Sequence, residues 1–258
     1  MTTFSVDMIA QWLVQFFIPF FRIAAFFATV PVFGNQLVPQ TVRLSLALVV
    51  ALLIAPMVSI SSPANLFSLP FFISIFQQIL IGVSLGFLVQ IFFHIFVLAG
   101  QMIAMQMGLG FASMVDPTNG VSVAVVSQFY VILVTLLFLS FNGHLVTIEV
   151  LTESFRFLPI EGGVLSSSAA YSLAVSGLWM FVSAFLLALP AVSAILIVNF
   201  AFGVMTRAAP QLNIFSLGFP FTLIFGIFIL WVALAGFLPQ YQKLSEQLFD
   251  SLYRLAGA

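Results

Sequence analysis

Residues 71–107 decide the fold class, because FFISIFQQILIGVSLGFLVQIFFHIFVLAGQMIAMQM contains neither a proline nor a formally charged side chain. As one α-helix this stretch would be about 55 Å long at 1.5 Å per residue. The hydrocarbon core of a bilayer is only about 30 Å thick. The stretch must therefore protrude from a membrane, bend, or fold back as a hairpin, and we predict a break at residues 82–86.

The rest of the chain has the same apolar composition. Charged residues make up 5% of the 258 residues and hydrophobic residues 63%, whereas a soluble globular domain carries about 25% charged residues. No water-facing surface holds so many apolar side chains. We therefore predict an integral membrane protein or the core of a larger apolar assembly. The net charge of -1 and the lack of a basic run argue against nucleic acid as a partner.

Six apolar segments are predicted to be helices long enough to span a bilayer, at about 8–33, 41–60, 69–107, 121–150, 169–206 and 212–240. Strict alternation of apolar and polar residues is absent, which favours helices over barrel strands. The fold class is thus all-α, with long helices that form kinked hairpins. Pro190 lies in the middle of the fifth segment and should kink it or divide it.

The last segment, 241–255, changes character and is predicted to be an amphipathic helix. One face is apolar and the other is charged. Such a helix either lies at a membrane interface or docks onto a partner. The apolar face carries Tyr241, Leu244, Leu248, Leu252 and Leu255.

Polar side chains within the apolar segments are the first candidate functional residues. Gln90, His94 and Gln101 fall at i, i+4 and i+11, nearly on one face of a helix. They could line a wet conduit or relay protons, but hydrogen-bonded helix packing is the interpretation we favour. Arg22 and Arg207 are buried cations that should turn toward a partner or water. For Arg207 a charge at a helix C-terminus is an equal alternative, since Pro210 follows.

Residues 82–86 (GVSLG) match the G-x-S-x-G pattern of a serine hydrolase. That pattern needs a strand, a turn and a helix around it, and here it lies within a charge-free apolar segment. The spacing of Gly82 and Gly86 instead favours close approach of two helix backbones. No cysteine is present, and His94 and His144 lie far apart in the chain, so we expect no metal site, no cofactor and no catalytic residue.

The loop 107–117 combines glycines, which allow conformations that helices do not, with Met, Leu and Phe instead of polar residues. It could be a soft apolar plug in a pore, because methionine repacks readily and apolar constrictions gate by excluding water. A buried connector without a gating role is the alternative. The residues concerned are Met107, Gly108, Leu109, Gly110, Phe111, Met114, Asp116 and Pro117.

Several strings, taken together and in order, resemble the FliR/SctT family of type III export-gate proteins, of which the flagellar members are the FliR proteins. The resemblance covers essentially the whole chain, including its amphipathic end. The strings are 77–82 (QQILIG) with 85–87 (LGF), 107–109 (MGL) with 116–117 (DP), 141–145 (FNGHL), and 207–215 (RAAPQLNIF) with 218–220 (GFP).

The resemblance implies a non-enzymatic protein of helical hairpins, present as one copy and assembled with FliP and FliQ into a closed cone. Unfolded flagellar subunits would enter that cone, with FlhB around its mouth and FlhA below. The chain would comprise a FliP-like portion at about 1–165 and a FliQ-like portion at about 166–258. The cone would sit in the inner membrane at the flagellar basal body, largely on the periplasmic side, and loop 107–117 would be its plug. Some family members carry an acidic residue near Asn199, and this chain has none there.

Two alternatives belong to other classes of protein. A polytopic secondary transporter would place a polar site near the membrane midplane around Gln90, His94 and Gln101. Inverted repeats would favour it, and none is clear. An intramembrane hydrolase using Ser84 lacks a plausible base and acid.

Overall fold

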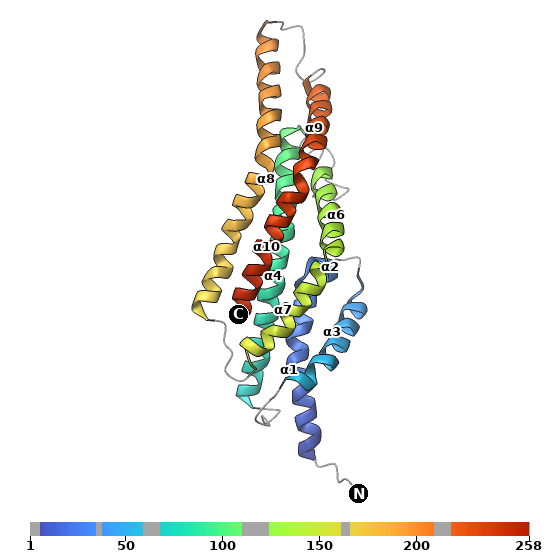
Figure 1. The fold of residues 1–258 in the computed structure, drawn as a ribbon, viewed down its shortest axis with the longest axis vertical. Helices are drawn as coiled ribbons and strands as arrows, with labels where there is room; N and C mark the ends of the chain where they lie inside the picture. The colour runs from blue at the N-terminus through green and yellow to red at the C-terminus, as the bar shows by residue number, and fades with distance from the viewer. Residues whose placement is uncertain are drawn as a thin grey trace. The chain divides into compact units, whose positions relative to one another are not determined.

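The computed structural model describes residues 6–34, 38–58, 68–109, 124–160, 166–208 and 218–257. Within these ranges every regular element is a helix, which confirms the predicted all-α fold (Figure 1). The elements are α1 (Val6–Thr29), α2 (Pro31–Gly34), α3 (Gln40–Ile54), η1 (Ala55–Met57), α4 (Leu69–Gln106), α6 (Val125–Ser140), α7 (Gly143–Phe157), α8 (Ser167–Ala208), α9 (Phe219–Ala233), η3 (Leu234–Gly236) and α10 (Phe237–Ala256).

Four helical stretches in the described residues are long and apolar enough to cross a membrane. The bent pair α6–α7 makes a fifth if it counts as one span. The first predicted segment is represented by the shorter apolar stretch Val14–Thr29 of α1. The four stretches are Gln40–Met57, Leu69–Gln106, Ser167–Arg207 and Phe219–Ala256.

Helix α4 runs unbroken through residues 82–86, so the predicted break there is wrong (Figure 1). The two glycines serve close packing against α1 instead. A Cβ atom on Gly82 would overlap the carbonyl oxygen of Arg22 and lie 3.1 Å from the Cβ of Ala25. A Cβ atom on Gly86 would overlap the hydroxyl of Thr29. The helix therefore stays regular, and the missing side chains let the two backbones approach each other.

Helix α8 is also longer than expected for a single span. Its 42 residues continue through Pro190, so the proline does not divide it, and the helix is about 63 Å long at 1.5 Å per residue. Figure 1 shows that α8 changes direction along its length, as expected for a helix with a proline in its interior.

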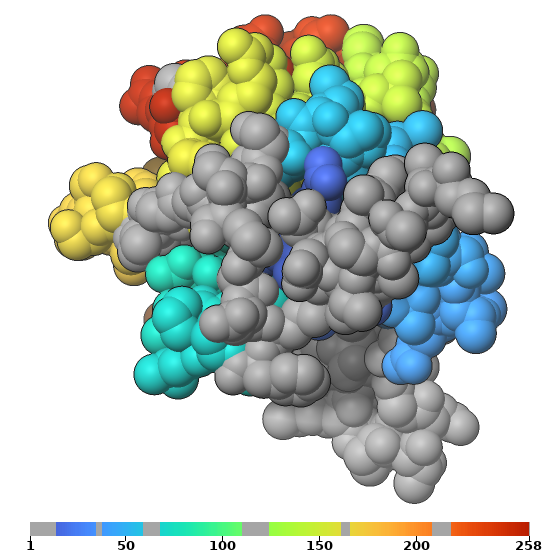
Figure 2. Space-filling view, turned by 90° about the horizontal axis from the view of Figure 1, so that it is seen from below, coloured from blue at the N-terminus to red at the C-terminus, as the bar shows by residue number. Residues whose placement is uncertain are grey.

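The chain forms two compact units. Unit 1 comprises Met1–Ile91, Leu139–Ser176 and Gln247–Ala258, and unit 2 comprises Phe92–Phe138 and Gly177–Glu246. In unit 1, α1 packs against α3 and α4. Figure 2 shows side chains of α3, of the start of α4 and of the end of α7 on one face of this unit. Unit 1 thus brings together segments that are far apart in the sequence.

Unit 2 is built around the second half of α4. Gly100 faces the backbone of Ser127 in α6, where a Cβ atom would lie 2.6 Å from the Ser127 Cα. An aromatic cluster joins α4 and α6 to the start of α10, with Phe96 and Phe237 ring centroids 5.5 Å apart. Tyr241 of α10 contacts Phe92 of the same cluster at 5.8 Å. The buried face of α10 is the one predicted from its sequence pattern.

Helices α6 and α7 meet at an angle of 66°. Asn142 adopts a left-handed conformation there, with φ of 57°, which asparagine tolerates better than most residues. Gly143, the first residue of α7, is buried. The string FNGHL at 141–145 therefore encodes a bend between two apolar helices.

The Gly82 packing predicts a strong difference between two glycine-to-alanine substitutions. Gly82→Ala should destabilise the chain by about 1–3 kcal/mol, because the added methyl group meets a backbone carbonyl that cannot move alone. Gly177, where an added Cβ atom would have no neighbour within 4 Å, is the matched control. Gly177→Ala should be neutral or stabilising by up to about 1 kcal/mol. The apparent melting temperature of the detergent-solubilised chain measures both, and equal values for the two variants would contradict the packing.

Candidate functional site

The described part of the predicted plug loop is its beginning, Met107, Gly108 and Leu109. We call these three residues, together with Gln106 at the end of α4, the loop root. The remaining predicted plug residues, Gly110, Phe111, Met114, Asp116 and Pro117, lie outside the described residues. The loop root belongs to unit 2, as do α9 and the part of α8 that surround it.

Gly108 ends helix α4 in a left-handed conformation, with φ of 82°. Its amide donates to the carbonyl of Met105 at 3.0 Å, and the amide of Leu109 donates to the carbonyl of Ala104 at 3.0 Å. These two bonds form a Schellman motif, in which a glycine commonly takes the left-handed position. The sequence MGL at 107–109 therefore specifies where the helix stops.

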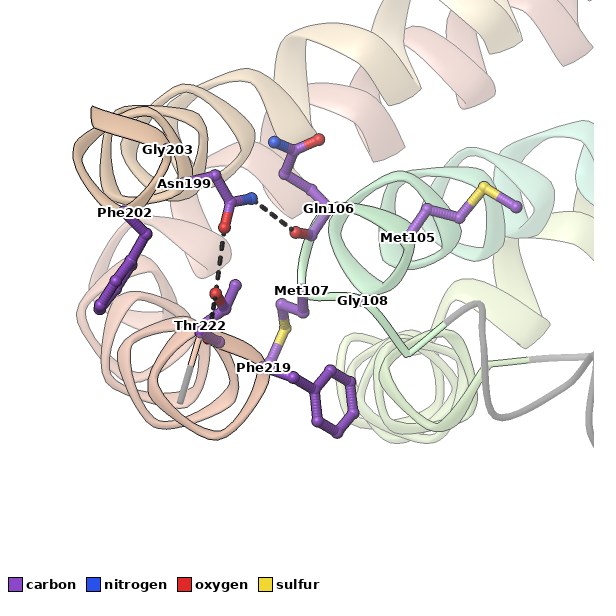
Figure 3. Close-up of a pocket in the computed structure, with 10 residues that line it drawn as sticks. Met105, Gln106, Met107, Gly108, Asn199, Phe202, Gly203, Phe219 and Thr222 are labelled. Atoms are coloured by element: carbon purple, nitrogen blue, oxygen red, sulfur yellow. Dashed lines mark hydrogen bonds between the residues drawn. The ribbon is translucent and has the colours of Figure 1, made fainter. Parts of the chain in front are cut away.

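Asn199 of α8 connects the loop root to α9 (Figure 3). Its Nδ2 donates to the carbonyl oxygen of Gln106 at 3.3 Å. Its Oδ1 accepts from the hydroxyl of Thr222 at 3.0 Å. The Thr222 hydroxyl also lies 2.8 Å from the carbonyl oxygen of Gly218, and its single proton serves one acceptor at a time. Three helices thus meet through one amide.

Met107 is buried and lies against Gly226 of α9. A Cβ atom at position 226 would be 2.6 Å from both the Cγ and the Cε of Met107. The methionine fills the space that the glycine leaves on α9, so the loop root is held by packing as well as by hydrogen bonds.

A pocket of about 640 Å³ lies beside the loop root (Figure 3). Among the described residues, those that line it are apolar or carry neutral amide and hydroxyl groups. It is an apolar space with amide and hydroxyl groups. Its lining residues are Met105, Gln106, Met107, Gly108, Asn199, Phe202, Gly203, Gly218, Phe219 and Thr222.

Unit 1 contains a second polar cluster, the Arg22 centre. Arg22 has no exposed surface. Its Nε donates to Gln78 Oε1 at 2.7 Å, its Nη1 to Ser154 Oγ at 3.0 Å, and its Nη2 to the carbonyl of Leu158 at 2.8 Å. The guanidinium carbon lies 4.1 Å from the centre of the Phe155 ring. Arg22 was predicted to turn toward a partner or water. In the structure its hydrogen-bond partners are uncharged groups of α4 and of α7 with its C-cap residue Leu158.

The Arg22 centre is stabilised by dipoles in place of a counter-charge. Leu158 caps the C-terminus of α7, where helix carbonyls carry partial negative charge, and the ring face of Phe155 attracts a cation. Ser154 donates its own proton to Leu151 at 2.6 Å, which leaves its lone pairs free to accept from Arg22. Among the described residues, the ion pair that forms is the exposed one between Arg254 and Asp250.

The other predicted polar residues differ in how far this chain buries them. Gln90 and Gln101 are half-buried, whereas His94 and Arg207 are exposed. His94 and Arg207 are thus not buried by this chain itself, and their contacts in an assembly stay a prediction. Arg207 lies in the last turn of α8, where a cation is favoured by the helix dipole.

The sequence patterns did not indicate a functional role for Asn199, Thr222 or Gly226. Asn199 was named only because some members of the family that the chain resembles carry an acidic residue near this position. A local pattern could have indicated Asn199, because it is the one amide side chain in the otherwise apolar run 194–205. Such a group inside an apolar helix needs a hydrogen-bond partner.

Comparison with known proteins identifies the class of protein to which this chain belongs. The family model described as "Bacterial export proteins, family 1" matches residues 13–248. The chain is therefore an all-α membrane protein of a bacterial export apparatus.

Relatives narrow the class to the flagellum. The chain is 41% identical to the flagellar biosynthetic protein FliR of Pectobacterium carotovorum subsp. carotovorum, over 98% of this chain and 96% of that protein. It is 39% identical to FliR of Escherichia coli K12, over 95% and 92%, and 30% identical to FliR of Bacillus subtilis 168, over 85% and 86%. The chain belongs to the FliR family and is an inner-membrane component of the flagellar export apparatus.

The Arg22 centre predicts that substitution of the arginine is costly even when the charge is kept. Arg22→Lys cannot reach three acceptors on different sides with one ammonium group, and breaking a buried charged network costs about 3–5 kcal/mol. The double variant Arg22→Met with Gln78→Leu should recover part of that loss, because it removes a partner that would otherwise stay unpaired. Melting temperatures of the solubilised chain test this, with Arg254→Met as the exposed control.

Ser84 is predicted to have no catalytic role. Its buried hydroxyl donates to the carbonyl of Leu80 in its own helix at 2.7 Å, and alanine favours a helix interior. Ser84→Ala should therefore leave swimming on soft agar unchanged at equal expression. A stably expressed but non-motile Ser84→Ala strain would contradict the packing role and revive the hydrolase hypothesis.

Proposed function

We propose that this chain is a non-enzymatic subunit of the flagellar export gate, and that with FliP and FliQ subunits it forms the pore through which unfolded flagellar subunits are exported. The partners, the single copy of this chain, and the division into a FliP-like portion at about 1–165 and a FliQ-like portion at about 166–258 belong to this proposal. So do contacts with FlhB and FlhA and the position of the assembled cone on the periplasmic side of the inner membrane.

The observation that carries the proposal is the length of exposed apolar surface on α8. Exposed apolar side chains extend from position 171 to position 205 of this helix, which is about 51 Å along its axis. A bilayer core of about 30 Å cannot cover that length even at a tilt of about 40°. Other apolar proteins must cover the remainder. The side chains include Tyr171, Leu178, Leu186, Ile197, Phe200 and Met205.

The share of residues that the chain itself buries in each long helix also supports coverage by neighbouring subunits. In the most apolar window of α4, 67% of the residues are buried inside the chain, but only 22% in that of α8 and 17% in that of α9–α10. Helix α4 therefore acts as the internal core. Helices α8 and α9–α10 present apolar faces that lipid or neighbouring subunits must bury, and the length of the exposed surface on α8 favours neighbouring subunits.

We further propose that the loop beginning at Met107 seals the pore when no substrate is present. A channel for unfolded chains of any sequence cannot rely on specific polar recognition, yet it has to hold back ions and water. Apolar side chains exclude water when packed together, and methionine repacks with little strain. Arg207, exposed in this chain, would contact a neighbouring subunit.

An added charge on α8 should affect assembly differently if neighbouring subunits cover this helix than if lipid covers it. Glutamate placed singly at Tyr171, Leu186, Ile197 and Met205 tests the full length of the exposed stripe. If neighbouring subunits cover it, all four variants should lower the yield of the complex with FliP and FliQ several-fold, because each buries an unpaired charge. Lipid alone can contact only part of the stripe, so at least one end should tolerate the change.

Native mass spectrometry of the chain co-expressed with FliP and FliQ measures that yield and should show one copy of this chain per complex. The chain expressed alone should be recovered in lower yield than in the complex and should unfold at a lower temperature. A well-behaved homodimer made without partners would reject the assembly and favour the secondary transporter.

A further inference from the structure

Charged side chains are concentrated on two helices that meet in unit 1. Seven of the thirteen charged residues of the chain lie there, three on α7 and four on α10. The ends of the two helices are in contact, because a Cβ atom on Gly257 would lie 3.1 Å from the Cβ of Phe157. The Tyr253 hydroxyl of α10 is also within electrostatic range of Glu149 and Glu153 of α7. The charged residues of α7 and of the end of α10 therefore belong to one surface.

The apolar face of α10 is already occupied by the chain itself. Leu248 has no exposed surface, and Leu252 and Tyr241 are each 1% exposed. The sequence pattern left two uses open for this helix, at a membrane interface or on a partner, and both need a free apolar face. Because the chain buries that face, α10 turns its charged face outward.

The outward face of α10 carries charge over a length that lipid cannot cover. Its charged side chains are exposed from Lys243 to Arg254, which is about 17 Å along the axis at 1.5 Å per residue. A stretch of that length along the membrane normal, inside a hydrocarbon core of about 30 Å, would bring charge to the midplane. Charge is expensive there, so this face has to lie outside the hydrocarbon.

The charges on this face compensate each other within the chain. Arg254 Nη2 and Asp250 Oδ2 are 2.9 Å apart, and the two side chains are 77% and 60% exposed. Lys243 and Glu246 carry opposite charges at i and i+3, where side chains on a helix are neighbours. The face of α10 thus has no net charge to match against a partner. The exposed face of α8, by contrast, is apolar and needs cover.

We infer that the charged faces of α7 and α10 form a water-facing surface, which stays in contact with the aqueous phase when the chain is assembled in the export apparatus. We call this surface the hydrophilic face, defined by Glu149, Glu153, Glu246, Asp250 and Arg254. The candidate span Phe219–Ala256 then contributes to a bilayer at most the part before Lys243. This inference goes beyond the proposed function, because it fixes where water meets the chain whether or not the chain forms a pore.

Single-cysteine labelling tests the hydrophilic face directly, because the chain contains no cysteine of its own. Glu149→Cys and Glu246→Cys place a thiol on this face. Ile197→Cys is the control, because Ile197 is 70% exposed in this chain but lies on the apolar stripe of α8. A membrane-impermeant maleimide reacts with the thiolate, which apolar surroundings disfavour. We expect both glutamate positions to react at least about tenfold faster than position 197, which corresponds to a difference of about one in the thiol pKa.

The maleimide is applied to spheroplasts and to inverted inner-membrane vesicles of cells that carry the complete export apparatus, so that both aqueous sides are sampled. Reaction from either side supports the inference and identifies the side on which the hydrophilic face lies.

Charge reversal distinguishes water from a neighbouring protein surface. Glu149→Lys and Glu246→Lys should leave complex yield and swimming on soft agar unchanged. Neither glutamate is in an ion pair among the described residues, and exposed charges contribute little to stability. Ile197→Glu is the matched control on the apolar stripe of α8 and should lower the yield.

The outcomes separate the inference from the proposed function. Lack of reaction from both sides, with the complex intact, overturns the inference and leaves the proposed function standing. A several-fold loss of yield in either charge-reversal variant also overturns it, because a charged partner then covers the face. Fast labelling of a chain that forms no complex with FliP and FliQ supports the hydrophilic face and rejects the proposed function.

Discussion

The structure depends on how a chain with six basic and seven acidic residues among 258 hides its backbone and its few polar groups from an apolar environment. Helices satisfy their own backbone groups, so the remaining problem lies at helix ends and at the contacts between helices. Close contacts are made where a glycine faces a neighbour: Gly82 against α1, Gly100 against α6, and Gly226 against Met107. These positions allow dense packing with almost no polar attraction between helices.

The two polar clusters each supply a hydrogen-bond donor to a carbonyl group at the end of a helix. Arg22 donates to the carbonyl of Leu158 at the end of α7, and Asn199 donates to the carbonyl of Gln106 at the end of α4. In both cases a side chain from another helix satisfies a carbonyl that the helix itself leaves open. These two polar side chains therefore satisfy carbonyl groups at points where helices of this chain stop.

The sequence predicted the elements better than the contacts. Hydropathy and segment length were sufficient to predict the all-α fold. The three- and four-residue spacing of apolar residues was sufficient to predict which face of α10 is buried. The glycines at 82 and 86 were ambiguous, because a glycine can either interrupt a helix or let another helix pack closely against it. Which of the two happens depends on α1, which is distant in the sequence. The partners of Arg22 are separated from it by 56 to 136 residues. Asn199 was missed because its two partners come from different helices, which no local pattern reveals.

The neutral surroundings of Arg22 also determine how unit 1 responds to its chemical environment. Its hydrogen-bond acceptors are an amide, a hydroxyl and a peptide carbonyl, none of which binds or releases a proton between mildly acidic and mildly basic pH. Salt does not compete for them either, because the group is fully enclosed and buried charges are screened little. Acid on either side of the membrane thus finds no carboxylate to neutralise among these partners. The packing of α1, α4 and α7 is insulated from changes in proton and salt concentration that would weaken an ordinary ion pair.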